Sequence, residues 1–147
     1  MNHIRCAIPD TEIKKGNNKK IIQLDGEEVK DINSFYTALV NELEFPEYFG
    51  ENLDALYDML TDLQWLNFKC FVIVITNFNA FLSEEDFETK AEVMAVLDDA
   101  IQAWIEDVND EESWDSKKLS VWLLGEPVTL QKEMHACSSY LETSEEE

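Results

Sequence analysis

Basic residues are scarce in this sequence, which has 11 Lys and Arg against 32 Asp and Glu and a formal net charge of −21. Binding to a nucleic-acid backbone depends on Lys and Arg side chains that displace counterions from phosphates, so a general nucleic-acid binder is excluded. An anionic membrane surface would repel the chain for the same reason. The expected partners are therefore cationic, and a basic protein surface is the first candidate.

Histidine and glycine are also rare. The two histidines, His3 and His135, lie outside the segments expected to form the core, which leaves no Ser-His-Asp or Cys-His arrangement there for nucleophilic catalysis. Only four glycines occur, and neither a phosphate-binding loop nor a dinucleotide fingerprint is present. We expect no cofactor and no metal. Paired carboxylates could serve an enzyme, but such pairs are unavoidable among 32 acids, so the sequence favours a protein that is not an enzyme.

Cysteines and long apolar runs are few. Cys6, Cys70 and Cys137 are odd in number and widely spaced, which fits neither a disulfide framework nor a metal-binding pattern. We interpret Cys70, inside an apolar strand signal, as a small buried residue. The longest apolar stretch, residues 71–75, is too short to cross a bilayer, and the first 20 residues contain no run of signal-peptide length. These features indicate a cytoplasmic protein with free thiols.

Apolar material is nevertheless sufficient for one domain, because 45% of the 147 residues are hydrophobic and 11% are aromatic. The patterns predict alternating strands and helices, and helical crossovers between strands imply a parallel sheet, hence an α/β fold with three strands. We expect a domain at 19–126, flanked by an N-terminal extension (1–18) and an acidic C-terminal extension (127–147) whose last six residues form a solvated tail. The predicted elements are a strand at 19–26, a helix at 35–44 capped by Ser34, a helix from the Asn52 cap to about 65, a strand at 68–75, a helix at 83–108 and a strand at 119–124.

Residues 45–62, here called the acidic segment, differ from their surroundings. In the predicted helix, Asp54, Asp58 and Asp62 recur every four residues, Glu51 precedes them, and the chain has no Lys or Arg between Asp31 and Lys69. Like charges at this spacing destabilise a helix by about 0.2–0.5 kcal/mol per pair. These acids could simply form a solvated outer face. The residues expected on the core-facing arc of the same helix are Leu53, Leu56, Tyr57, Leu60 and Leu63.

Aromatic side chains lie beside these acids. Phe49 and Tyr57 could belong to the core, whereas Tyr48, on a loop directly after Pro46-Glu47, is harder to bury. Gly50 is expected to supply the flexible backbone position of this loop. Rings next to unpaired carboxylates suit an interface with a basic active site, in which rings fill a cleft and carboxylates replace substrate phosphates.

The sequence PEYFGENLDALYDML, residues 46–60, closely resembles the inhibitory segment of the barstar family, intracellular inhibitors of a secreted ribonuclease. The Asp25-Gly26 turn before the first predicted helix also resembles this family, and the likeness extends over about 19–126. The resemblance implies a small barstar-like α/β domain in which a three-stranded parallel sheet packs against helices. It also implies a barnase-inhibitor-like immunity protein that forms a heterodimer with a basic protein toxin, a ribonuclease, and binds no nucleic acid and no membrane.

The resemblance further implies roles for single residues. Asp58 matches the acid that enters the phosphate-binding centre of the nuclease, Asp54 a second acid in the basic cleft, and Tyr48 the ring that covers the site. Asp99, on the third predicted helix, takes the place of a further contacting glutamate. The complete set of expected toxin-binding residues is Tyr48, Glu51, Asp54, Tyr57, Asp58, Asp62 and Asp99.

Two other functions remain open from the sequence. One is a phosphate-mimicking module that binds a basic nucleic-acid-binding protein without inhibiting it. The other is a carboxylate-based or metal-dependent enzyme.

Overall fold

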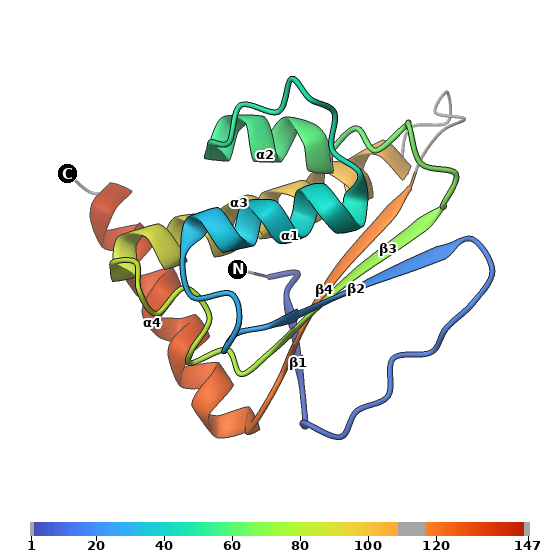
Figure 1. Cartoon of the computed structure of the whole chain (residues 1–147). Coiled ribbons are helices and arrows are strands. Elements are labelled where there is room, and N and C mark those ends of the chain that lie inside the picture. The colour runs from blue at the N-terminus through green and yellow to red at the C-terminus, as the bar shows by residue number, and fades with distance from the viewer. Residues whose placement is uncertain (1, 109–116, 146–147) are drawn as a thin grey trace.

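The computed structural model describes residues 2–108 and 117–145, and its centre is a four-stranded parallel sheet in the order β1-β4-β3-β2 (Figure 1). The expected α/β class with a parallel sheet is confirmed. The elements in chain order are β1 (Arg5–Ala7), β2 (Lys19–Asp25), α1 (Ile32–Leu43), α2 (Leu53–Leu60), β3 (Cys70–Thr76), α3 (Phe87–Val108), β4 (Lys118–Leu124) and α4 (Pro127–Glu145).

The sheet has one strand more than the three predicted, because β1 comes from the expected N-terminal extension. This strand of three residues pairs with β4 only at Trp122–Leu124. A strand this short carries almost no alternation that a sequence pattern could show. The amino-terminal half of β4, residues 118–121, therefore has no β1 residue paired with it.

The C-terminal extension is also structured. Pro127, the first residue of the expected C-terminal extension, begins α4, which suits a residue that is favoured at the first position of a helix. Leu130 and Cys137 are buried and Met134 packs against the core, a helical spacing on one face. The last six residues, expected to form a solvated tail, are helical as far as Glu145, where α4 ends, and residues 146 and 147 lie outside the described residues.

One face of the sheet carries α1, α2 and α3, and the main core lies between these helices and the strands. β3 is buried from Phe71 to Ile75, as predicted for a strand covered on both faces. The opposite face has a smaller apolar cluster around Val72, Val74 and Leu124. α2 contacts α3 in the helical layer, so the acidic segment lies on the helical side of the sheet.

α1 begins one turn earlier than predicted. Its N-cap is Asp31, whose carboxylate accepts a 2.8 Å hydrogen bond from the Ser34 backbone N–H. Ser34 is the partner in a capping box and not the cap itself. The hydrogen bonds from Ser34 lower the pKa of Asp31. Both residues favour helix starts, so the sequence alone could not decide between them.

The end of α1 is strained. Glu44 follows the last helical residue with φ 51° and ψ 47°, a left-handed conformation, and its N–H donates to the Val40 carbonyl. A side chain in this region costs roughly 1–2 kcal/mol, and glycine is the usual residue at such a helix end.

Glu44→Gly is therefore expected to raise the free energy of unfolding by about 0.5–1 kcal/mol, since the relieved strain exceeds the added flexibility of the unfolded chain. Urea denaturation measures this change. Asn41→Gly, at an exposed position inside α1, is the control and should lower the free energy of unfolding by up to about 0.5 kcal/mol. Destabilisation by both substitutions would contradict the left-handed strain at Glu44.

The three thiols are free, as expected. Cys137 is buried, but Cys70, expected to be buried, is only half-buried because its side chain lies on the face of the sheet without α1, α2 and α3. Within residues 2–108 and 117–145, no helix is long and apolar enough to span a bilayer.

Candidate functional site

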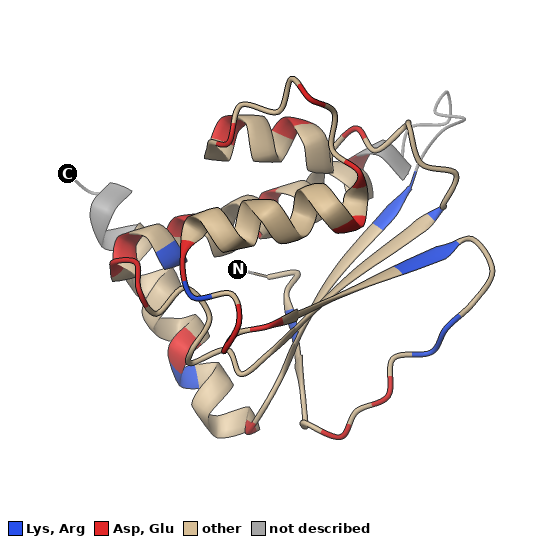
Figure 2. Cartoon of the chain, in the orientation of Figure 1, with Lys and Arg blue, Asp and Glu red and all other residues tan. Residues whose placement is uncertain are grey.

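The acidic segment forms a loop followed by α2, above the helical layer in Figure 1. Figure 2 shows acidic residues along this loop and helix, whereas basic residues gather at the amino ends of the strands. The segment therefore presents negative charge on a part of the surface that lacks basic side chains of its own.

Aromatic contacts fix the loop to α1. The ring of Phe49 packs edge-on against Tyr36 of α1, with centroids 5.4 Å apart, and against Phe45, with centroids 5.0 Å apart. Phe49 is half-buried against the core, while the adjacent Tyr48 is 72% exposed. Phe49 thus anchors the loop, and its neighbour points into solvent.

The turn before α2 has its unusual backbone at Glu51 and not at Gly50. Glu51 has φ 49°, and none of the described glycines has a positive φ. Gly50, expected to supply the flexible backbone position of the loop, has no positive φ, and the left-handed residue of the turn is Glu51. A left-handed non-glycine residue is strained, and such strain is frequent at functional sites. Burial and the nearby negative charge of Glu51 raise the pKa of Tyr36.

Asn52 caps α2, as predicted. Its side-chain oxygen accepts a 2.8 Å hydrogen bond from the Ala55 N–H, and its amide donates to the Gly50 carbonyl at 3.2 Å. Because these bonds join the loop to the first turn of the helix, the cap fixes the direction in which Asp54 and Asp58 leave α2.

α2 ends at Leu60, about one turn earlier than predicted. Thr61 Oγ1 donates a 2.8 Å hydrogen bond to the Tyr57 carbonyl, and Leu63 adopts φ 55°, which breaks the helix while its side chain remains buried. Asp62 therefore does not continue the row of Asp54 and Asp58 on the helix. It lies in the following turn, exposed, and its carboxylate accepts a 3.4 Å hydrogen bond from the Gln64 N–H.

The two faces of α2 separate apolar from acidic side chains. Leu56, Met59 and Leu60 are buried, and Leu53 is half-buried against the core. The expected position of Tyr57 on the core-facing arc is wrong, because this side chain is 37% exposed. The exposed members of the expected site in this region are Tyr48, Glu51, Asp54, Tyr57, Asp58 and Asp62.

Two indole N–H groups support the acidic segment, and no sequence pattern predicts either of them. Trp104 of α3 donates a 2.8 Å hydrogen bond to the Leu60 carbonyl at the end of α2. Trp65 donates a 2.9 Å hydrogen bond to the Leu43 carbonyl at the end of α1. Helix ends leave carbonyl groups without intrahelical partners, so these bonds satisfy one such carbonyl of α2 and one of α1 and hold the two helix ends in position.

The exposed carboxylates of the acidic segment are absent from the ion pairs between described side chains, which are Lys20–Glu42 and Lys90–Glu133. Asp99 is exposed on α3, a separate element, and already interacts with its own chain. In the part of the chain that the structure describes, no group of three His, Cys, Asp or Glu side chains could hold a metal ion.

Comparison with known proteins identifies the family. The family model described as Barstar (barnase inhibitor) matches residues 19–124. A protein of Bacillus subtilis (strain 168), named "Putative ribonuclease inhibitor YrdF", is 35% identical over 94 residues, which are 60% of this chain and 99% of that relative. The match spans the sheet strands β2 to β4 and includes the whole acidic segment. This chain belongs to the barstar family of barnase inhibitors.

Proposed function

We propose that this chain is a cytoplasmic immunity protein that inhibits a toxic ribonuclease by inserting the acidic segment into its basic active site. The proposal agrees with the family and with the name of the Bacillus relative as a ribonuclease inhibitor. The partner is one ribonuclease molecule, in a heterodimer.

The observation that carries the proposal is a set of exposed carboxylates beside an exposed ring. Glu51, Asp54 and Asp58 are exposed, and no ion pair between described side chains neutralises them. Tyr48, with 72% of its surface exposed, stands next to them on a loop that Phe49 anchors. An exposed ring and unpaired charges make little contribution to folding, so a binding role accounts for both.

The chemistry of a ribonuclease explains the preference for carboxylates. Such an enzyme gathers Lys, Arg and protonated His around the phosphate that it cleaves, and these groups donate hydrogen bonds to carboxylate oxygens as readily as to phosphate oxygens. Asp58 takes the phosphate-binding centre and Asp54 the adjoining cleft, while Tyr48 covers the opening. Glu51, Tyr57, Asp62 and Asp99 extend the contact.

A ribonuclease assay tests this function. A basic ribonuclease of the barnase type is purified, and its cleavage of RNA is measured with increasing amounts of the chain. The expected result is complete loss of cleavage at one equivalent. A tight complex that still cleaves RNA would contradict inhibition and favour the non-inhibitory phosphate mimic, whereas the absence of a complex would contradict both.

The association rate should depend strongly on salt. At low ionic strength, we expect a rate constant of about 10⁸ M⁻¹s⁻¹ or more because the negative field of the segment attracts the basic cleft. Raising NaCl from about 50 to about 500 mM should slow association at least about tenfold and change dissociation much less, since screening acts before contact. Stopped-flow fluorescence measures both rates.

Two variants that each lose three acids, and so have the same net charge, distinguish the charge of the acidic segment from the total charge of the chain. Glu51→Gln/Asp54→Asn/Asp62→Asn should show a weaker salt dependence, while Glu27→Gln/Glu88→Gln/Glu92→Gln, at exposed positions elsewhere, should keep most of it. Equal salt dependence in both variants would show that only the total charge matters and would contradict steering by the acidic segment.

A further inference from the structure

A cavity of about 820 Å³, within the range of small-molecule sites, lies over the face of the sheet opposite to α1 and α2. At the edge of β4 that β1 leaves unpaired it also reaches Ile101, Trp104 and Ile105 of α3. Successive residues of a strand point to opposite faces, and the sheet residues on this side that line the cavity are Lys19 of β2, Cys70 and Val72 of β3, and Lys118, Ser120 and Trp122 of β4. Leu119 of β4 lines it as well. The strand register aligns Lys19, Cys70 and Lys118 in one row at the amino end of the sheet. Ser120 and Val72 form the next row.

The third row brings a ring and a guanidinium together. Arg5 of β1 is paired with Trp122 of β4, and its Cζ lies 5.8 Å from the centroid of the indole. Trp122 is half-buried, so part of its ring surface remains open to the cavity. The floor therefore offers an indole ring with a guanidinium placed over it.

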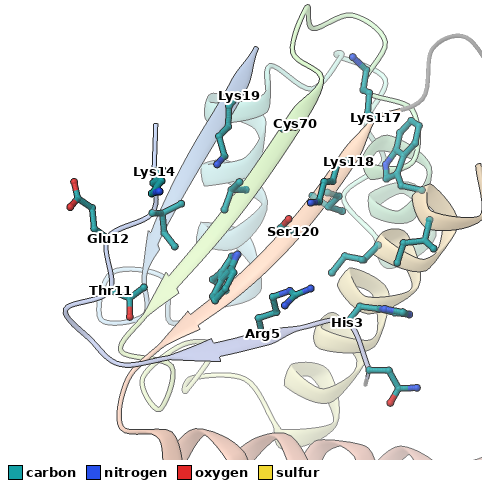
Figure 3. A pocket seen from close by; sticks show the side chains of 18 residues that line it. His3, Arg5, Thr11, Glu12, Lys14, Lys19, Cys70, Lys117, Lys118 and Ser120 are labelled. Carbon is teal, nitrogen blue, oxygen red and sulfur yellow. The ribbon is translucent and has the colours of Figure 1, made fainter. Parts of the chain in front are cut away.

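Cations surround this floor. Figure 3 shows Arg5, Lys14, Lys19 and Lys118 around the cavity, from β1, the loop after it, β2 and β4. None of these four takes part in the ion pairs recorded between described side chains. Glu12 also lines the cavity. Lys117 does too, but its ammonium group donates to the carbonyls of Leu66 and Phe68 and is therefore already used.

This concentration of basic side chains is unusual for the molecule. The chain has only 11 Lys and Arg against 32 acids, yet four of the basic side chains meet at one concave surface without a carboxylate partner in an ion pair. Like charges that converge without partners destabilise a fold, and an anion bound among them would remove that repulsion. The electrostatics therefore favour an anionic ligand.

The total charge of the chain limits the size of this ligand. The screening length at physiological salt is about 8 Å, so a small anion inside the cavity is affected mainly by the four nearby cations. A long polyanion, such as RNA or an acidic protein, would extend over the acidic remainder of the surface and be repelled by it. The ligand is therefore a small molecule with few charges.

We propose that this cavity binds a nucleoside phosphate, with the base on Trp122 and the phosphate among the surrounding cations. Arg5 can give a phosphate two parallel hydrogen bonds, and Lys118 and Lys19 supply ammonium groups from the row at the amino end of the strands. Stacking of a base on an aromatic side chain is worth about 1–3 kcal/mol, which a bare phosphate cannot gain. This site is separate from the acidic segment and does not depend on the function proposed above.

Isothermal titration calorimetry with the full chain tests the proposal, with AMP and GMP as probes. We expect binding of one nucleotide per chain with a Kd below about 1 mM, together with a change in tryptophan fluorescence. Adenosine and inorganic phosphate, each carrying half of the recognised chemistry, should bind at least about tenfold more weakly. Trp122→Leu should reduce nucleotide affinity to the level of inorganic phosphate.

Charge-reversal variants locate the site. Arg5→Glu/Lys118→Glu should weaken nucleotide binding at least about tenfold. Lys30→Glu/Lys132→Glu changes the net charge equally at exposed positions outside the cavity and should alter the Kd by less than about threefold. Thermal melts of all variants establish that each is folded at the temperature of the titration.

Several outcomes would overturn the proposal. No heat of binding up to about 5 mM nucleotide would exclude a useful affinity. Equal affinity for inorganic phosphate would exclude a base on Trp122, and equal affinity for adenosine would exclude a phosphate among the cations. Tighter binding of a hexaglutamate peptide or a single-stranded oligonucleotide would assign the cavity to an acidic peptide or to a nucleic acid instead. Equal loss in both charge-reversal variants would place binding elsewhere.

Discussion

Asp58→Ala is expected to weaken binding of the ribonuclease by about 2–5 kcal/mol, chiefly through faster dissociation. In the complex that we propose, this carboxylate is buried among the basic groups of the active site. Removing it loses charge-assisted hydrogen bonds and also leaves those cations buried without a counterion. Isothermal titration calorimetry, or surface plasmon resonance for the dissociation rate, measures the change.

The same substitution should leave the fold intact or slightly more stable. Asp58 is exposed in the last turn of an eight-residue helix, where a negative charge is disfavoured by the helix dipole. It also stands four residues from Asp54, a repulsive spacing, and alanine is the better helix former. Together these effects predict a gain of about 0.5–1 kcal/mol in the free energy of unfolding. Loss of affinity with a gain in stability distinguishes a binding residue from a structural one.

Glu27→Ala is the matched control, since it removes one exposed acid from the turn after β2, outside the proposed interface. It should change the affinity by less than about 0.5 kcal/mol, as expected for a charge at a distance. Asp58→Asn keeps the shape of the side chain without its charge and should lose most of the affinity that the alanine variant loses. An affinity of Asp58→Ala within about threefold of the unchanged chain would remove Asp58 from the interface.

The sequence predicted the centre of the fold well because the core strands and helices are strongly patterned. The run Phe71–Ile75 has no polar interruption, which identifies a strand buried on both faces. The strand–helix alternation then implied parallel pairing, and the structure confirms this pairing for every strand pair.

The predictions failed where short-range hydrogen bonds decide the ends of elements. A four-residue acid spacing suggested that α2 continues through Asp62, but the Thr61 hydroxyl and the left-handed Leu63 end it at Leu60. Nothing in the residue types shows that Leu63 takes a positive φ, because burial of its side chain in the tertiary structure imposes it. The residue type of Glu51, an exposed side chain directly after a glycine, does not show its φ of 49° either.

The strand and the helix outside 19–126 were not predicted, for a related reason. β1 has only three residues and owes its place to the partner strand β4. α4 has few apolar residues, and these pack against α3 and the core. Their role as a buried helix face is therefore visible only once α3 is in place. Such segments depend on tertiary contacts, which local periodicity does not encode.

At the candidate site, the residue types predicted most of the exposed side chains. They did not predict which contacts hold the acidic segment in place. Tyr48 was expected to resist burial and is exposed. Neither the indole hydrogen bond from Trp104 to the end of α2 nor the one from Trp65 to the end of α1 was foreseen, since each joins residues far apart in the chain.

Gly26→Ala should cause the largest loss of stability, about 3 kcal/mol or more, with a melting temperature lower by about 10 °C. A Cβ atom at this position would lie 2.0 Å from the Asn77 carbonyl oxygen and 2.8 Å from the Phe81 nitrogen, both of them backbone atoms. The backbone cannot simply move away, because the Gly26 N–H donates to the Thr76 carbonyl at 2.8 Å and Phe81 N–H donates to that same Asn77 oxygen at 3.2 Å. Close packing of the two chain segments, and not a positive φ, thus accounts for glycine in the Asp25-Gly26 turn.

Gly16→Ala is the control for this effect, because its added Cβ would meet only the Lys19 side chain, at 4.0 Å, and Gly16 does not have a positive φ. That variant should gain about 0.4–1 kcal/mol, since alanine restricts the unfolded chain. Differential scanning calorimetry of both variants measures the contrast. Equal melting temperatures for the two would mean that the turn after β2 and the loop after β3 can separate without cost. The contact between them would then not fix where α1 begins, nor hold Tyr36 where it anchors the loop of the acidic segment through Phe49.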